Sequence, residues 1–253
     1  MRLVFAFALS AILAAPAAAA DLAPLYPDSA AFALGVNVKG IAASPLGKKV
    51  IGTDMPFDAT RKLLRVLFPE DLFTPTKERL QPLEAVANTL NTVTVVGSVF
   101  GEGGPPPVVV FLEGSAAEGE YLKAAEGFAK AEGRPFATEK LGDRTLFTLG
   151  RNGDTVYGVR VADGLTLASR RELIDEVLDK HAGKRKAAVQ QPLLDWIKKA
   201  NPAETPIWLA VGEIKNVDGL HGGVATIALK DGADLRIEVR TEKEDLAASV
   251  RHL

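Results

Sequence analysis

Four pairs of strand-like segments in this chain are each joined by a short run of turn-forming residues, and no other feature constrains the fold as strongly. The joining runs are Gly101–Pro107, Arg151–Asp154, Ala162–Gly164 and Lys230–Ala233. The segments that they join are Thr92–Phe100 with Val108–Leu112, Thr145–Leu149 with Thr155–Val161, Val156–Val161 with Leu165–Ala168, and Val224–Leu229 with Leu235–Val239. A tight turn joins neighbouring antiparallel strands, whereas parallel strands need a long crossover. The chain is therefore predicted to form a mainly antiparallel sheet.

A second pattern, a strand-like run followed by Ser or Thr and then by Glu three residues later, occurs three times. It lies at Ser115–Glu118, Ser169–Glu172 and Thr241–Glu244. In such a capping box the hydroxyl and the glutamate each accept a hydrogen bond from a backbone N–H that the helix leaves unpaired, so a helix is expected to start at each position. Gly133 and Gly183 are suited to end the first two helices. The expected fold class is α+β, with a mainly antiparallel sheet and helices packed on one face of it.

The chain also contains a weak internal likeness, because Phe32–Lys39 resembles Trp208–Lys215 in its aromatic, small and lysine positions. We therefore interpret residues 21–253 as a single α+β domain with an internal duplication. Residues 21–135 and 200–253 would share a strand, a hairpin and a capped helix. Two further helices are expected in the first half, at Ala59–Phe68 and from Pro82 to Leu90.

The first residues have the features of an export signal. Arg2 precedes the apolar stretch Leu3–Pro16, and the small residues Ala18–Ala20 precede Asp21. A basic start, an apolar middle and an A-x-A end are typical of a signal peptide. We expect residues 1–20 to be a signal peptide that is cleaved after Ala20, which would make the protein periplasmic or secreted. The alternative, an uncleaved N-terminal membrane anchor, stays open at this stage.

The composition excludes several classes of chemistry. The chain has no cysteine, so disulfides, thiolate catalysis and cysteine-ligated metal sites are excluded. The residue after the expected cleavage site is Asp21 and not the cysteine of a lipoprotein, so no lipid anchor and no stable membrane span are expected after cleavage. The formal net charge of −2 gives no overall attraction to nucleic acid, and no nucleic-acid partner is expected.

The histidines do not form a catalytic or metal-binding pattern. His181, His221 and His252 are the only three, and no two of them have the spacing of metal ligands. His221 is followed by two glycines, as in the oxyanion stretch of some esterases, but the chain has no G-x-S-x-G nucleophile motif. We therefore assign no catalytic, cofactor-binding or metal-binding residue, and we expect no cofactor.

Three groups of residues leave alternatives open. Scattered carboxylates such as Glu113, Asp143 and Glu213 would permit a carboxylate-dependent hydrolase only if the fold brought two of them together. The basic residues Lys180 and Lys184–Lys186 could bind phosphate, anionic glycan or lipid headgroups, but we interpret them as a solvated helix end.

A basic amphipathic helix carrying Arg61, Lys62 and Arg65 could lie on a membrane, although we favour docking on the sheet. Trp196 and Trp208 are expected in the core; the alternative is an exposed tryptophan that stacks on a sugar.

The segment Leu25–Phe32, followed by Val36–Val38 and Ser44–Lys48, resembles the start of exported bacterial proteins of unknown function. Those proteins have a leader, then a Pro-Asp-Ser/Thr segment that runs into a strand, then repeated strand pairs and helices. The resemblance implies a cell-envelope location and supplies no catalytic residues.

Together these observations favour an exported cell-envelope protein that acts as a non-catalytic binding or scaffolding module, with an unknown envelope protein, glycan or lipid as its partner. The alternatives are a carboxylate-dependent hydrolase of envelope polymers and a carrier of lipids or other hydrophobic molecules.

Overall fold

The computed structural model describes residues 22–51, 81–98, 107–151, 154–213, 220–242 and 245–252. The expected signal peptide, the expected helix at Ala59–Phe68 with its three basic residues, and most of the loop Gly101–Pro107 lie outside these ranges.

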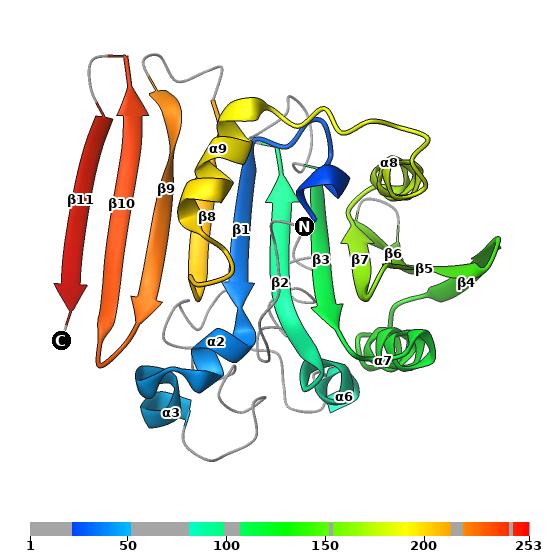
Figure 1. Cartoon of the computed structure of the whole chain (residues 1–253). Helices are drawn as coiled ribbons and strands as arrows, with labels where there is room; N and C mark the ends of the chain where they lie inside the picture. Colours follow the sequence, from blue (N-terminus) through cyan, green and yellow to red (C-terminus); the bar gives the residue numbers. More distant parts are fainter. Residues whose placement is uncertain are drawn as a thin grey trace.

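The described strands form one sheet of eleven strands in the order β11-β10-β9-β8-β1-β2-β3-β7-β6-β5-β4 (Figure 1). Every neighbouring pair is antiparallel. The strands are β1 (Phe32–Asn37), β2 (Leu90–Gly97), β3 (Val108–Gly114), β4 (Phe136–Leu141), β5 (Arg144–Arg151), β6 (Asp154–Val161), β7 (Gly164–Ala168), β8 (Ile207–Val211), β9 (Leu220–Leu229), β10 (Ala233–Thr241) and β11 (Asp245–His252). The α+β class and the antiparallel sheet are therefore confirmed, and the four predicted pairs are observed as β2–β3, β5–β6, β6–β7 and β9–β10.

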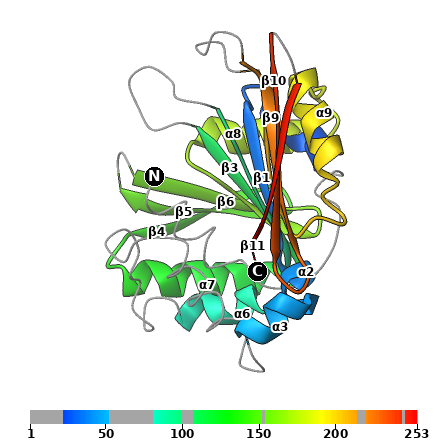
Figure 2. The same ribbon diagram turned by 90° about the vertical axis from the view of Figure 1, so that its left-hand side faces the viewer.

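The helices cover both faces of the sheet and not one face as predicted (Figures 1 and 2). They are η1 (Ala23–Leu25), α2 (Val38–Ala43), α3 (Pro45–Ile51), η2 (Gln81–Leu83), α6 (Glu84–Ala87), α7 (Glu118–Ala131), α8 (Arg171–His181) and α9 (Gln191–Ala200). Helices α2, α6 and α7 pack into one buried cluster, and α8 and α9 pack into a second cluster on the other face. The reason is visible in β3, where Val110 and Leu112 belong to the first cluster while Val109 and Phe111 belong to the second. A strand that is apolar at successive positions must be covered on both sides.

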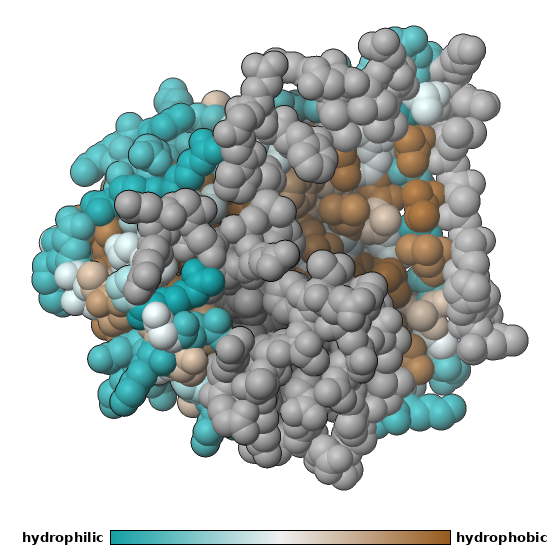
Figure 3. Space-filling view, turned by 180° about the vertical axis from the view of Figure 1, so that it is seen from behind, coloured by the Kyte–Doolittle hydropathy of each residue, from teal (hydrophilic) through white to brown (hydrophobic). Residues whose placement is uncertain are grey.

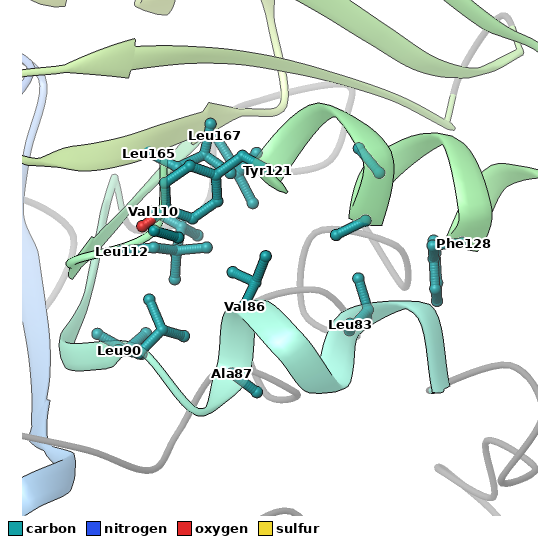
Figure 4. Packing of buried hydrophobic residues seen from close by; sticks show 14 of the residues in the cluster. Leu83, Val86, Ala87, Leu90, Val110, Leu112, Tyr121, Phe128, Leu165 and Leu167 are labelled. Atoms are coloured by element: carbon teal, nitrogen blue, oxygen red, sulfur yellow. The ribbon is translucent and has the colours of Figure 1, made fainter. Parts of the chain in front are cut away.

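The first cluster shows how a helix pair is held against the sheet. Tyr121 of α7 points at Leu112 and Leu165 of the sheet, while Phe128 of the same helix lies beside Leu83 (Figure 4). All five side chains are buried.

Two of the three predicted capping boxes precede helices, but neither hydroxyl caps its helix. Helix α7 begins after Ala117, whose N–H donates to Glu120 Oε2 at 2.7 Å, so Ser115 lies outside the cap. Ser169 Oγ accepts a hydrogen bond from Val108 N at 3.0 Å, and Arg170 is the N-cap of α8. The predicted ends are confirmed, since Gly133 and Gly183 have φ angles of 63° and 70°.

The third predicted helix is wrong, because the residues after Thr241 lead into strand β11. This strand pairs with β10 from Arg240↔Asp245 to Ala233↔His252. The physical reason is that β10 would otherwise present a long row of unpaired backbone groups, which β11 satisfies. In the described residues after Thr241, strand β11 stands where the capped helix of residues 200–253 was expected, while the duplication itself stays a prediction.

Candidate functional site

Strands β8, β9 and β10 carry only apolar residues on one face over residues 207–211, 223–227 and 235–239. Antiparallel pairing places Leu209 beside Ala225 and Ala225 beside Ile237, and alternate positions on each strand share this orientation. We call this surface the β8–β10 apolar face; its members are Ile207, Leu209, Val211, Gly223, Ala225, Ile227, Leu235, Ile237 and Val239. No member of this set has a polar side chain.

The β8–β10 apolar face is open and slightly hollowed. A groove of about 240 Å³ runs between Leu209, Val211, Ala225, Ile237 and Val239. Leu209 is 36% exposed and Ile237 is 39% exposed, and among the described residues these are the exposed large hydrophobic side chains. Figure 3 shows the hydrophobic residues gathered on this face, on the side of the sheet away from α9. An exposed apolar patch of this kind is typical of a binding surface.

The same sheet face is partly buried on β1 and buried on β2. Leu34 of β1 pairs with Leu209, and Val95 of β2 pairs with Leu34. Val95 is buried in the first cluster, against which Leu34 and Ile207 also pack. The apolar face is thus a continuation of the core beyond the helices that cover it.

The opposite face of these strands is built differently. Helix α9 covers it with Trp196, which is flanked by Lys199 and Arg240 at 5.1 and 5.3 Å from the ring centroid. Glu238 forms ion pairs there with Lys199 and Arg236. The hydrogen bond from Lys199 lowers the pKa of Glu238 against the effect of burial, and Arg236 adds to the lowering. The charged side chains of Arg236, Glu238 and Arg240 on β10 therefore make their contacts on the α9 face.

Both tryptophans are buried, as predicted, with exposed fractions of 4% for Trp196 and 1% for Trp208. Neither offers a ring on which a sugar could stack.

A second hollow, of about 460 Å³, is lined by residues that lie far apart in the sequence. We call it the Glu113 pocket. It lies between Leu22–Leu25, the end of β3, the β6–β7 turn with Asp163, and the end of α8 with Lys180 and His181.

The three candidate carboxylates are not brought together. Glu113 on β3 is level with Asn37 at one end of β1, whereas Glu213 lies beyond Val211, which pairs with Phe32 at the other end. These two ends of β1 are about 17 Å apart. Asp143 lies in the β4–β5 turn, is 92% exposed and forms an ion pair with Arg144. Glu113 and Glu213 are therefore farther apart than the carboxylate pair of a glycosidase.

The basic cluster is not uniformly solvated, because Lys180 is buried. Its Nζ atom donates to Tyr26 O at 2.5 Å, Asp28 Oδ1 at 2.6 Å and Glu176 Oε1 at 2.8 Å. Arg185 also binds Asp28, at 2.5 Å. Burial alone would raise the pKa of Asp28, but the hydrogen bonds from Lys180 and Arg185 outweigh it and lower the pKa to about 2. This cluster ties the segment before β1 to α8, while Lys184 and Lys186 are exposed.

The histidines are dispersed. His181 is exposed at the end of α8 and lines the Glu113 pocket, and His221 is exposed on β9. The backbone of His252 pairs with Ala233. In the part of the chain that the structure describes, no three His, Asp or Glu residues are grouped so that they could hold a metal ion. Within the same ranges, none of the helices has the length and apolar character needed to cross a bilayer.

Sequence reasoning missed the β8–β10 apolar face. The period-two alternation of Leu235, Ile237 and Val239 was a usable signal for a strand with one apolar side. The alternation could not show that Ile237 on this side is exposed and not covered by another segment.

Comparisons with known proteins add information about the fold only. No protein-family model and no curated protein match the chain. Two solved structures of TP0453 resemble it. Crystal form IV has a TM-score of 0.55 and 12% identity, over 90% of this chain and 92% of that one. Crystal form I has a TM-score of 0.51 and 12% identity, over 89% and 80%. At this identity the likeness supports the α+β fold and carries no function.

Proposed function

We propose that this protein is an exported, non-catalytic binding protein that takes a hydrocarbon chain on the β8–β10 apolar face. The observation that carries the proposal is the groove between Leu209 and Ile237, which combines two exposed large hydrophobic side chains with a lining that is apolar apart from Glu238. The carboxylate of Glu238 forms ion pairs with Lys199 and Arg236. Of the three partner classes that the sequence leaves open, a lipid fits this surface best.

The chemistry of the face favours an acyl chain over a glycan. Sugars are held by hydrogen bonds and by stacking on exposed aromatic rings, and the face offers neither from its own side chains. A hydrocarbon chain needs only apolar contact, and each buried methylene contributes about 0.8 kcal/mol. The flat, uninterrupted run of apolar positions across three paired strands supplies that contact.

Binding to this face should depend on chain length and little on headgroup. We expect dodecyl maltoside and dodecanoate to bind with similar affinity below their micelle concentrations. Decyl maltoside should bind roughly tenfold more weakly than dodecyl maltoside, because two methylenes are lost. Isothermal titration calorimetry on the mature chain measures all three.

The matched variants are Leu209→Asn and Ile237→Asn on the face, with Ala228→Asn on the opposite face of β9 as the control. Each of the first two should weaken dodecyl maltoside binding by about tenfold, since a polar amide would lie against the chain. The control should bind as the wild type does. Undetectable binding by the wild type, or equal binding by all four proteins, would reject the proposal.

Export is the second part of the proposal, and its support is the sequence pattern of Arg2, Leu3–Pro16 and Ala18–Ala20. The test is expression of the full chain in a Gram-negative host, followed by cell fractionation and N-terminal sequencing. A product in the periplasm or medium that begins at Asp21 is expected. A cytoplasmic product that retains Met1 would contradict export.

A further inference from the structure

The Glu113 pocket is a hollow separate from the groove on the β8–β10 apolar face. Glu113 follows Phe111 and Leu112 on β3, and Phe111 belongs to the buried cluster on the α8 and α9 side of the sheet. The groove lies on the other side of the sheet, on strands that β1 and β2 separate from β3. The two spaces therefore cannot share one ligand.

The pocket combines apolar walls with a few polar groups. Leu22, Leu25 and Phe111 give it apolar surface, while Glu113, Asp163 and His181 contribute polar side chains. Its volume of about 460 Å³ lies in the range of sites for small organic molecules. Such sites use apolar contact for affinity and a few polar groups for specificity.

The residues that line the pocket include two acidic side chains, Glu113 and Asp163, and one lysine, Lys180. The Nζ atom of Lys180 is held by Tyr26 O, Asp28 and Glu176, and those two carboxylates offset its charge. Glu113 and Asp163 contribute two further carboxylates. Their charges disfavour an anion and favour a cation within a few ångströms.

The buried phenol of Tyr26 lies within electrostatic reach of Glu113. Burial is the main reason why the pKa of Tyr26 is raised well above its usual range, and the charge of Glu113 is the next cause. The charge of the Glu113 carboxylate therefore affects a buried group behind the pocket.

We propose that the Glu113 pocket binds a small organic cation, an amine attached to a compact apolar body. The ammonium group would approach the carboxylates of Glu113 and Asp163, and the apolar body would lie against Leu22, Leu25 and Phe111. A charge-assisted hydrogen bond to a partly buried carboxylate is among the stronger polar contacts available to a ligand. This site would recognise a headgroup, whereas the groove would recognise a hydrocarbon chain.

The test compares octylammonium, octanol and octanoate by calorimetry on the mature chain, because the three share one chain and differ in headgroup charge. Octylammonium should bind at least about tenfold more tightly than the other two. Glu113→Gln should remove that preference, and Asp143→Asn, which removes an exposed carboxylate from a nearby turn, should keep it. Equal binding of the three compounds by the wild type would overturn the proposal.

Two further variants keep the result interpretable. Asp163→Asn changes an exposed turn residue, so it should fold even if Glu113→Gln does not, and it should weaken octylammonium binding several-fold. Leu209→Asn alters the groove, which does not distinguish headgroups, so it should leave the preference for octylammonium over octanol and octanoate unchanged. If Leu209→Asn removes that preference while Glu113→Gln and Asp163→Asn keep it, the amine occupies the groove and the pocket assignment is wrong.

Discussion

At the scale of single residues, glycine at position 35 allows strands β1 and β8 to pack closely around a tryptophan ring. Gly35 of β1 pairs directly with Trp208 of β8. A Cβ atom on residue 35 would lie 2.1 Å from an atom of the Trp208 ring. Trp208 is among the largest fully buried side chains, so its ring has no free space into which it could move.

Gly35→Ala should therefore destabilise the protein by about 2 kcal/mol, since overpacking forces strain on a filled core. Urea denaturation measures the free energy of unfolding, and a shift in tryptophan emission would report the displaced ring. The control is Gly119→Ala in α7, where a Cβ atom would meet nothing within 4 Å. It should be neutral or stabilising, because alanine favours helix over glycine. Equal losses in the two variants would contradict this account.

Lys180 is the second residue with a strong prediction. Its side chain is 1% exposed, and its removal would leave the carboxylates of Asp28 and Glu176 facing each other in a largely buried place. Lys180→Met should destabilise the protein by about 3 kcal/mol, the range found when one partner of a buried ion pair is removed. Lys184→Met, at an exposed position just after the same helix, should change stability by less than about 0.5 kcal/mol. Thermal and urea unfolding of both variants measure these changes in the free energy of unfolding. A loss below about 1 kcal/mol for Lys180→Met would contradict a structural role for the cluster of Lys180, Asp28 and Glu176.

At the scale of elements, the start of α7 shows where local sequence signals mislead. The Ser115–Glu118 spacing fits a capping box, yet the structure starts the helix at Glu118 with Ala117 as N-cap. Ser115 follows directly after β3, and its N–H donates to Thr89 O at 3.2 Å. The backbone at Ser115 is therefore committed to β2 and β3, and the box shifts two residues to Ala117 and Glu120.

Ala117→Ser should stabilise the protein by about 0.5 to 1 kcal/mol, since Ala117 lacks the side-chain acceptor that an N-cap usually provides. Ser115→Ala should leave the free energy of unfolding nearly unchanged. Urea denaturation of the two variants measures the change in the free energy of unfolding. Residues 115 and 117 are both exposed, so neither substitution disturbs the core. If Ser115→Ala instead costs about 1 kcal/mol while Ala117→Ser has no effect, the helix starts where the sequence pattern placed it.

At the scale of the whole molecule, the Asp28 cluster joins segments that are far apart in sequence. Asp28 bonds to Lys180, to Arg185 and to the backbone N–H of Ala188. It thereby holds the entry to the central strand β1 against the layer formed by α8. Through it, the charge state of one carboxylate affects the stability of the complete fold.

This arrangement predicts acid sensitivity. The pKa of Asp28 is about 2 in the folded protein and about 4 in an unfolded chain. Its stabilising effect should be complete above about pH 4 and be lost as the pH falls through about 2. In Asp28→Asn, the free energy of unfolding should therefore fall less between these pH values than in the wild type. Asp143→Asn, at an exposed carboxylate, serves as the control and should follow the wild type; parallel curves for all three proteins would contradict the prediction.

The candidate site could be predicted from the sequence only in part. The alternation of Leu235, Ile237 and Val239 shows that β10 has an apolar side, and the buried state of Trp196 and Trp208 was also expected. Nothing local shows that α2, α6 and α7 stop short of this side, because that depends on how three separate helices pack. Similarly, Glu113 and His181 meet at one pocket only because β3 pairs with β7, which leads into α8.

The sequence by itself determined the local pairings of this protein: the four hairpins, the glycine ends of α7 and α8 and the α+β class. These follow from turn chemistry and from alternation, which act over a few residues. Long-range packing accounts for the helices on both faces of the sheet, for the strand that follows Thr241, and for the exposure of Leu209 and Ile237 among the described residues. Each of these depends on whether another segment satisfies a strand edge or buries an apolar face, and that competition is settled between residues far apart in the chain.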